Sequence, residues 1–377
     1  MELMKNGLGD AAVDRIANAL SQTQSLSGSF DKIAFREKAI ALLPELELKQ
    51  RVQHLIDTLH EFLPKPFDLA LQCLLELPDY WDPGHADDPL RSFAAWPIID
   101  YIGYHGIDHP EISLPALQKL TDLFSAEFAI RPFLLKHPEL CHRYFEQWVK
   151  HNNDHVRRLV SEGSRPRLPW GIQLKPYMKD PTDNLRWLEA LKNDNSLYVR
   201  RSVANHLNDI SKDHPQVVIE LCQSWYPTAN DDVKWLIRHG LRSLIKSGQP
   251  EVFPLLGYSR EVKLEAPKLE LHTPSLVLGE ALEFELSLTS TAESTQTMVV
   301  DFALHLRKAN GKMAAKVFKW KAVTIEPGQT LVIKKQHSIK KISTRRYYSG
   351  EQKLDILING KSVAQENFIL DAKEKQK

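Results

Sequence analysis

The sequence predicts a mainly α-helical chain, an αα-superhelix (solenoid) of helical repeats, followed by a small all-β sandwich. In the first part of the chain, apolar residues recur at helical spacing, as in Leu55, Ile56 and Leu59. A pattern of residues also repeats within that part. In the last part, apolar and polar residues alternate as they do in half-buried strands. We therefore expect a helical-repeat domain at residues 1–257 and a β-sandwich domain at residues 262–377.

The repeat shows in two units with identical internal spacing. One starts at His137-Pro138 and the other at His214-Pro215, and each has a tryptophan 11 residues after its histidine. Each then reaches a valine 19 residues after that histidine, just beyond an Asn-Asp pair. The intermediate run 195–201 carries the same order of Asn, Val and Arg. An Asn or Asp that caps the second helix of each pair is typical of HEAT-like repeats.

The last part of the chain contains several runs with strand alternation, among them 282–288 and 354–358. The second of these runs ends at Asn359-Gly360, a dipeptide that two-residue hairpin turns favour. Several such strands within about 110 residues predict an immunoglobulin-like sandwich. The sandwich would have no disulfide, because this part of the chain contains no cysteine.

The composition is that of a folded globular protein, with 42% hydrophobic and 26% charged residues. No apolar run approaches the roughly 20 residues of a membrane-spanning helix, and the first residues lack a secretory-signal pattern, so we expect a cytoplasmic protein. The net charge of +1 hides an asymmetry, because residues 261–377 hold 19 Lys and Arg against 14 Asp and Glu. We expect no metal site and buried free thiols at Cys73, Cys141 and Cys222, which lack ligand spacing.

Two acidic residues in helical stretches are candidates for chemistry. Glu127 lies four residues before Arg131, where the cation would hold the carboxylate ionised. Asp209 continues a line formed by Arg201 and Asn205, both of which we expect to contact the lesion or the DNA. This line is turned away from the apolar seam of its helix and toward solvent or a groove. The simpler interpretation is that both are solvated helix faces with weak ion pairs.

A loop at residues 161–171 concentrates cations and an aromatic side chain. Two prolines and a glycine within it break the preceding helix. We expect Arg165 and Arg167, with Arg158 just before them, to grip phosphates, and Trp170 to lie against a flat or cationic group. The alternative is an inter-repeat turn closed by an apolar tryptophan.

Three runs resemble signature segments of the AlkC alkylpurine DNA glycosylases, in the same order. They are SAEFAIRPF at 125–133, SEGSRPRLPWG at 161–171 and VRRSVANHLNDISKDHP at 199–215. The opening run NALSQTQSLSGSFDKIAF also looks like the start of that family, and the resemblance covers residues 1–257. The strand-rich tail looks like the immunoglobulin-like domain that some AlkC proteins carry.

The resemblance implies a hydrolase of base excision repair, a DNA-3-methyladenine glycosylase type of enzyme. Such an enzyme hydrolyses the N-glycosidic bond of cationic alkylated bases, including 3-methyladenine and 3-methylcytosine, here without flipping the base. The resemblance also implies that Glu127 and Asp209 are catalytic, that Trp170 lies beside the lesion and that Arg158 lies in the cleft. The implied partner is double-stranded DNA carrying alkylated bases, bound by a monomer. Because no phosphate-loop, dinucleotide or metal motif occurs, we expect no cofactor.

The chemistry of the reaction fits two carboxylates. A cationic base is a good leaving group without protonation, so the enzyme has to stabilise the oxocarbenium-like sugar. A fixed carboxylate does this while it orients a water molecule. Glu127 and Asp209 suit both tasks.

The tail has a strongly basic stretch, in which residues 302–347 hold twelve Lys and Arg and a single acidic residue, Glu326. We expect the sandwich to be an accessory DNA-binding domain that attracts phosphates. The alternative is lysines that keep sheet edges from pairing with other strands. The cations that we expect to contact DNA include Lys340, Lys341, Arg345 and Arg346.

Two other functions stay open. A non-catalytic HEAT-type scaffold would bind a protein on its repeat surface, and a DNA-binding protein would have lost catalysis. A scaffold needs no set of carboxylate, aromatic and arginine side chains at three separate runs. Retention of both Glu127 and Asp209 favours an active glycosylase.

Overall fold

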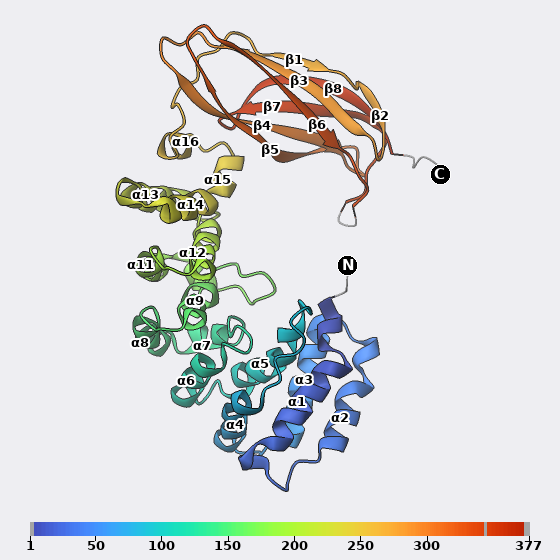
Figure 1. Ribbon diagram of the computed structural model, residues 1–377, viewed down its shortest axis with the longest axis vertical. Helices are drawn as coiled ribbons and strands as arrows, with labels where there is room; N and C mark the ends of the chain where they lie inside the picture. The colour runs from blue at the N-terminus through green and yellow to red at the C-terminus, as the bar shows by residue number, and fades with distance from the viewer. Residues whose placement is uncertain (1–3, 343–344, 373–377) are drawn as a thin grey trace. The chain divides into compact units, whose positions relative to one another are not determined.

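The computed structural model describes residues 4–342 and 345–372. Helices occupy the chain as far as Leu255, and strands follow from Lys268 onward (Figure 1). The predicted order, a helical part followed by a β-sandwich, is confirmed. Contacts divide the chain into two compact units, one of Met1–Asp213 with Asn230–Gly240 and one of His214–Ala229 with Leu241–Lys377.

The first unit contains most of the helices. Its helices are α1 (Asp10–Gln22), α2 (Lys32–Ala41), α3 (Leu48–Phe62), α4 (Phe67–Glu76), α5 (Trp96–His105), α6 (Pro110–Leu120), α7 (Ile130–Lys136), α8 (Pro138–Trp148), α9 (Asp154–Gly163), α10 (Lys175–Lys179), α11 (Thr182–Leu191), α12 (Leu197–Ile210) and α14 (Asp231–Gly240). In Figure 1, α8 and α11 form one row and α9 and α12 form a second row beside it. No helix of the described residues is long and apolar enough to cross a membrane.

The helix starts agree with the repeat seen in the sequence. α8 and α13 (Pro215–Trp225) each begin with the proline of a His-Pro pair. Proline is favourable there, because the N–H that it lacks would have no partner within the helix at that position. Asn153 caps α9 by accepting from the His155 N–H at 2.8 Å. Asn230 accepts in the same way from the Val233 N–H at the start of α14. The Asn that recurs in the two sequence repeats is therefore a helix cap in both of them.

The change from helix to strand falls between α16 (Val252–Leu255) and β1 (Lys268–Leu271). The compact units follow a different division, because α13, α15 (Arg242–Lys246) and α16 group with the strands. The domain boundaries 1–257 and 262–377 therefore stay a prediction.

The strands form two sheets in the described part of the second unit. They are β1, β2 (Ser275–Val277), β3 (Ala281–Thr289), β4 (Gln296–Arg307), β5 (Met313–Ile325), β6 (Thr330–Ser338), β7 (Gly350–Ile358) and β8 (Lys361–Asp371). One sheet has the order β1-β3-β6 and the other β2-β8-β7-β4-β5. The predicted hairpin is confirmed, because Asn359 (φ 45°) and Gly360 (φ 76°) join β7 to β8 in the left-handed region that this tight turn requires.

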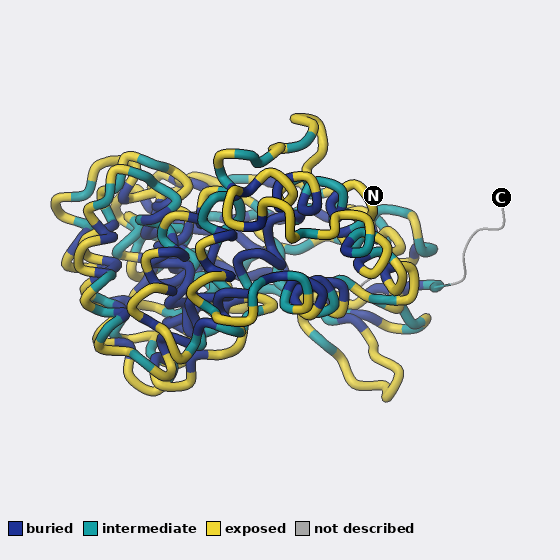
Figure 2. Tube along the Cα trace, turned by 90° about the horizontal axis from the view of Figure 1, so that it is seen from below, coloured by how far each residue is buried: buried dark blue, intermediate teal, exposed yellow. Residues whose placement is uncertain are grey.

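Figure 2 shows the buried segments in dark blue and the exposed residues, among them the projecting loops, in yellow. Phe284, Phe302 and Phe368 belong to the apolar core of the sandwich. All three cysteines are buried free thiols, as expected. Burial raises the pKa of the Cys141 and Cys222 thiols to about 12, so neither is a ready nucleophile.

Candidate active site

Glu127 lies in a turn just before α7 and pairs with an arginine from another helix. Arg158 of α9 donates from Nη1 to Glu127 Oε2 at 2.8 Å and to Ser125 Oγ at 2.8 Å. Arg131, the expected partner, is buried and donates instead to the carbonyls of Gly163 (2.8 Å) and Ile172 (2.7 Å). The expected helix pair does not form because Glu127 precedes the helix, where the i, i+4 geometry does not apply.

Asp209 is buried, with 2% of its side chain exposed, which corrects the expectation that it faces solvent or a groove. Helix α12 packs against both α9 and α14, so more of its surface is covered than on a helix with a single buried face. Within the line expected to be accessible, Arg201 is exposed and Asn205 is half-buried. Arg165 Nε donates to Asp209 Oδ2 at 2.8 Å, and Lys212 Nζ donates to Oδ1 at 2.9 Å.

A third carboxylate, Glu162 of α9, links the two arginines. Its Oε1 accepts from Arg165 Nη1 at 2.6 Å and lies 3.6 Å from Arg158 Nη2. The result is a continuous series of alternating charges, Glu127, Arg158, Glu162, Arg165 and Asp209, which we call the ionic chain. The two candidate catalytic carboxylates, Glu127 and Asp209, are the first and last members of the ionic chain.

The remaining oxygen of Glu162 is held by α12. Ser202 Oγ donates to Glu162 Oε2 at 2.6 Å and lies 2.9 Å from Ser161 Oγ. His206, fully buried one turn farther along α12, makes a 2.9 Å contact between Nδ1 and the Ser161 carbonyl. The centre of the ionic chain is therefore fixed to both α9 and α12.

Glu162 and its two arginines keep their charges at neutral pH. Burial works to raise the pKa of Glu162, but the neighbouring Arg158 and Arg165 outweigh it and the pKa is lowered. Burial likewise works to lower the pKa of Arg158 and of Arg165, but their carboxylate partners outweigh it and both are raised. Burial lowers the pKa of His206 to about 3, so this imidazole is neutral.

Trp170 stands on the loop after α9 with 51% of its surface exposed. Its φ of 66° lies in the left-handed region, which costs a non-glycine residue roughly 1 kcal/mol or more. Lys49 donates to the Trp170 carbonyl, and Arg131 holds the same loop at Ile172. The indole of Trp96 lies nearly parallel to that of Trp170, with 6.4 Å between ring centroids. These contacts hold the exposed indole in place.

Of the loop arginines expected to grip phosphates, Arg165 is buried in ion pairs, and for Arg167 the expectation stays a prediction. Arg165 is 8% exposed and is committed to Glu162 and Asp209, so it positions the carboxylates rather than reaching DNA. Arg167 pairs with Asp213 at 2.7 Å and is 29% exposed. The sequence could not reveal the pairs Arg165–Asp209 and Arg167–Asp213, because their members are 44 and 46 residues apart.

The sandwich cations fall into two groups. Lys316, Lys319 and Lys321 lie on β5, and Lys334 and Lys335 lie on β6, and both are edge strands. Their placement agrees with the alternative interpretation, lysines that protect a sheet edge. The second group lies outside the strands or at the end of β4. Arg307, Lys308, Arg345 and Arg346 line a hollow of about 300 Å³, and Lys340 and Lys341 are exposed.

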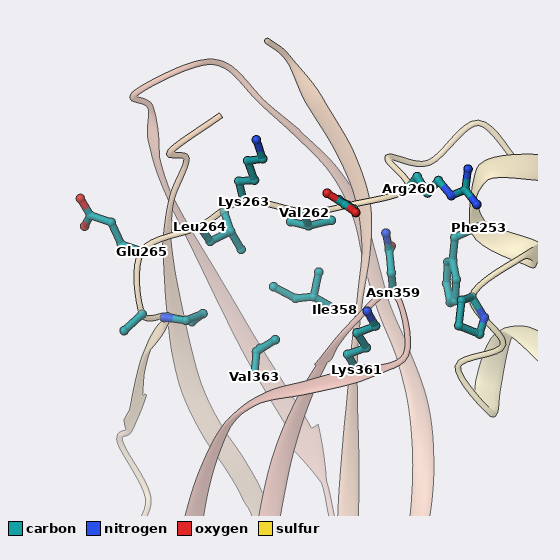
Figure 3. Close-up of a pocket in the computed structure, with 14 residues that line it drawn as sticks. Phe253, Arg260, Val262, Lys263, Leu264, Glu265, Ile358, Asn359, Lys361 and Val363 are labelled. Carbon is teal, nitrogen blue, oxygen red and sulfur yellow. The ribbon is translucent and has the colours of Figure 1, made fainter. Parts of the chain in front are cut away.

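A larger hollow, of about 520 Å³, lies in the second unit near Asn359 (Figure 3). Phe253, Val262 and Ile358 contribute apolar walls. Arg260 and Glu265 lie at opposite ends of it in Figure 3, so these two charges do not converge on one ligand atom. Among the described residues no cluster of His, Cys, Asp or Glu is arranged to hold a metal ion.

Sequence reasoning missed Glu162, Ser202 and His206. Glu162 belongs to the run SEGSRPRLPWG, four residues after Arg158 and three before Arg165. That spacing places an acid between two arginines on neighbouring turns, and it was the available signal. Nothing local distinguishes Ser202 and His206 from other helix residues.

The comparisons with known proteins identify the family. A family model described as "Uncharacterised protein YhaZ, C-terminal Ig-like domain" matches residues 265–372. YhaZ of Bacillus subtilis (strain 168) is 37% identical over 317 residues, which cover 84% of this chain and 85% of that protein. The solved structure of Pseudomonas fluorescens alkylpurine DNA glycosylase AlkC is similar over 98% of this chain and 100% of its own, with a TM-score of 0.88 and 35% identity.

This chain belongs to the AlkC family. The likeness spans the helical part and the sandwich, so the immunoglobulin-like fold expected for the tail is confirmed as well. The Pseudomonas AlkC was solved bound to DNA that contains an abasic site analog.

Proposed function

We propose that this AlkC-family chain is a DNA glycosylase of base excision repair. It hydrolyses the N-glycosidic bond of cationic alkylated bases, 3-methyladenine and 3-methylcytosine, in double-stranded DNA. It acts without flipping the base, as a monomer and in the cytoplasm. The family membership and the DNA bound by the Pseudomonas relative support the general activity.

The observation that carries the proposal is the ionic chain. Three carboxylates and two arginines are in contact within the first unit, and Glu127 and Asp209 are the two ends of the ionic chain. Burying so many charges is unfavourable unless their geometry is closely satisfied. A scaffold gains nothing from such a cluster, whereas an enzyme that must stabilise a developing cation gains a carboxylate, Glu127, that Arg158 fixes in place.

We assign the contact with the substrate to Glu127. Its side chain is 14% exposed, against 2% for Asp209. Arg158 binds Oε2, and we assign Oε1 to the attacking water or to the sugar. As the bond to the cationic base breaks, its electron pair stays on the base and positive charge develops on the deoxyribose. Glu127 stabilises that charge and orients the water, and Asp209 adds to the field through Arg165.

Trp170 supports the same chemistry from the loop. The exposed indole lies nearly parallel to Trp96 on a loop that Lys49 anchors at the Trp170 carbonyl. It presents a flat face, which attracts cationic rings and sugars by about 0.5–2 kcal/mol. Arg201, exposed on α12, is available for a phosphate, and Arg158 holds Glu127 in place. In the sandwich we assign DNA contact to Lys340, Lys341, Arg345 and Arg346.

The test is base release from methylated duplex DNA by the purified protein, measured by chromatography of the free base. The proposal predicts release of 3-methyladenine and 3-methylcytosine. A double variant, Glu127→Gln with Asp209→Asn, controls for a contaminating glycosylase. Protein that binds DNA but releases no base would support the DNA-binding alternative, and protein that does neither would support the scaffold.

A further inference from the structure

A small notch opens beside Trp170 in the helical unit. Its volume is about 260 Å³, and it is formed by α3, α5, the turn before α7 and the loop after α9. Its lining includes Lys49, Trp96, Asp100, Tyr104, Phe128 and Trp170. The ionic chain does not use it, although Phe128 directly follows Glu127 in the sequence.

Aromatic and apolar side chains surround the notch and are exposed to an unusual degree. Tyr104 is 61% exposed, Trp170 51% and Ile172 50%. Phe128 adds an inner wall and stacks on the buried Trp96 with 5.1 Å between ring centroids. Three exposed large side chains around one opening mark a binding surface, since single exposed apolar residues are ordinary but clustered ones are not.

The notch also contains a hydrogen-bond acceptor that lacks a donor. Asp100 Oδ2 accepts from Trp96 Nε1 at 2.7 Å. Its Oδ1 carries almost no accessible surface, and no described residue donates to it. A buried acceptor without a partner is unfavourable, so a ligand that brings an N–H to this oxygen removes that penalty.

We propose that the notch binds the free alkylated purine released by the reaction, a flat heteroaromatic ring with an amino group. This proposal rests on the proposed glycosylase function. The aromatic walls stack on either face of a purine, and the amino group donates to Asp100 Oδ1. The volume lies below the range of about 300–1,000 Å³ that holds drug-sized ligands, so it accepts a single base rather than a nucleotide.

The notch has no excess charge with which to hold the cationic lesion. It contains one ammonium group, that of Lys49, which lies 5.6 Å from the centroid of the Phe128 ring, and one carboxyl group, that of Asp100. Once the glycosidic bond has broken, the base has kept the bonding electron pair and is neutral. The notch therefore takes the base after cleavage, which draws the leaving group away from the sugar.

The experiment is equilibrium dialysis of the full-length protein against radiolabelled free 3-methyladenine. Variants Asp100→Asn and Tyr104→Ala each remove one feature of the notch. Stacking of a base on one aromatic side chain is worth about 1–3 kcal/mol, so Tyr104→Ala weakens binding by a factor of about 5 to 140. We expect at least a fivefold loss for Asp100→Asn as well. Ile33→Ala, a substitution of an exposed apolar residue on α2, is the matched control and leaves binding unchanged.

The outcomes separate this proposal from the proposed function. Protein that excises 3-methyladenine from DNA but shows no saturable binding of the free base up to about 10 mM overturns the notch proposal alone. Equal binding by the parental protein, Asp100→Asn and Tyr104→Ala also overturns it, because the base then binds elsewhere. Tyr104 is exposed, so its variant folds and keeps the test decisive. Absence of excision by the parental protein contradicts the proposed function, whatever the dialysis shows.

Discussion

The helical unit and the sandwich use charge in opposite ways. In the helical unit, Glu162, Arg165 and Asp209 are less than 10% exposed and each is paired with an opposite charge. In the sandwich, the cations are mostly exposed, and several of them line sheet edges or one hollow. Buried pairs hold a fixed geometry and are little affected by salt, whereas exposed cations act over a distance and are screened.

This difference separates catalysis from attraction. A field that stabilises a transition state must be in place before the reaction, which burial and pairing achieve. Attraction of a phosphate backbone needs only many cations near the surface. Substitutions in the two regions should therefore change different quantities.

The largest effect is expected when the centre of the ionic chain is changed. Glu162→Gln leaves Arg158 and Arg165 buried with one negative charge fewer, and the free energy of unfolding should fall by about 3 kcal/mol or more. Urea unfolding measures this. Glu61→Gln, which removes an exposed partner of Lys38, is the control and should change stability by no more than about 0.5 kcal/mol. Similar losses for both variants would show that the ionic chain contributes no more to the free energy of unfolding than a surface ion pair does.

A smaller effect concerns His206 and pH. Its folded pKa of about 3 lies below the ordinary value of 6.5, so the unfolded chain takes up a proton that the folded protein excludes as the pH falls below 6.5. The stability from this residue is complete above pH 6.5 and is lost down to about pH 3. The slope is at most about 1.4 kcal/mol per pH unit.

Denaturant unfolding between pH 7 and pH 4 measures the effect of His206. His206→Gln should lose stability less steeply than the parental protein over this range. His85→Gln, at an exposed histidine, should keep the parental slope. Parallel curves for His206→Gln and the parental protein would mean that His206 is protonated in the folded state.

The smallest effect separates the two groups of sandwich cations. Arg345→Gln with Arg346→Gln removes two charges beside the 300 Å³ hollow. If both contact phosphates, the slope of log affinity against log salt should become less steep by about 1.8, at 0.9 for each contact. Lys319→Gln with Lys321→Gln removes two charges from the edge strand β5 and should leave the slope unchanged. Equal effects of the two pairs on DNA binding would contradict this division.

The sequence predicts the parts of this molecule that depend on local pattern. Helical spacing, the Asn caps and the Asn359-Gly360 hairpin are written in neighbouring residues, and the structure confirms them. The burial of Asp209 was not predictable in this way. It depends on α9 and α14 covering α12 from two sides, and one helix cannot show how many neighbours it has.

The ion-pair partners of Glu127 and Asp209 also depend on the tertiary fold and not on local sequence. Glu127 and Asp209 were identified as candidates through the family resemblance, but the arginines that hold them are 31 and 44 residues away in the chain. A salt bridge of such separation depends on the tertiary fold rather than on spacing. Their roles in the reaction stay predictions.

The central claim is that Glu127 and Asp209 do the chemistry, and single-turnover excision of 3-methyladenine tests it most directly. Glu127→Gln and Asp209→Asn keep the size of each side chain and remove its charge. Each should slow excision tenfold or more, about 1.4 kcal/mol of transition-state stabilisation, while the affinity for DNA persists. Glu61→Gln should react at the parental rate. If both active-site variants also excise 3-methyladenine at the parental rate, the assignment of the two carboxylates is wrong.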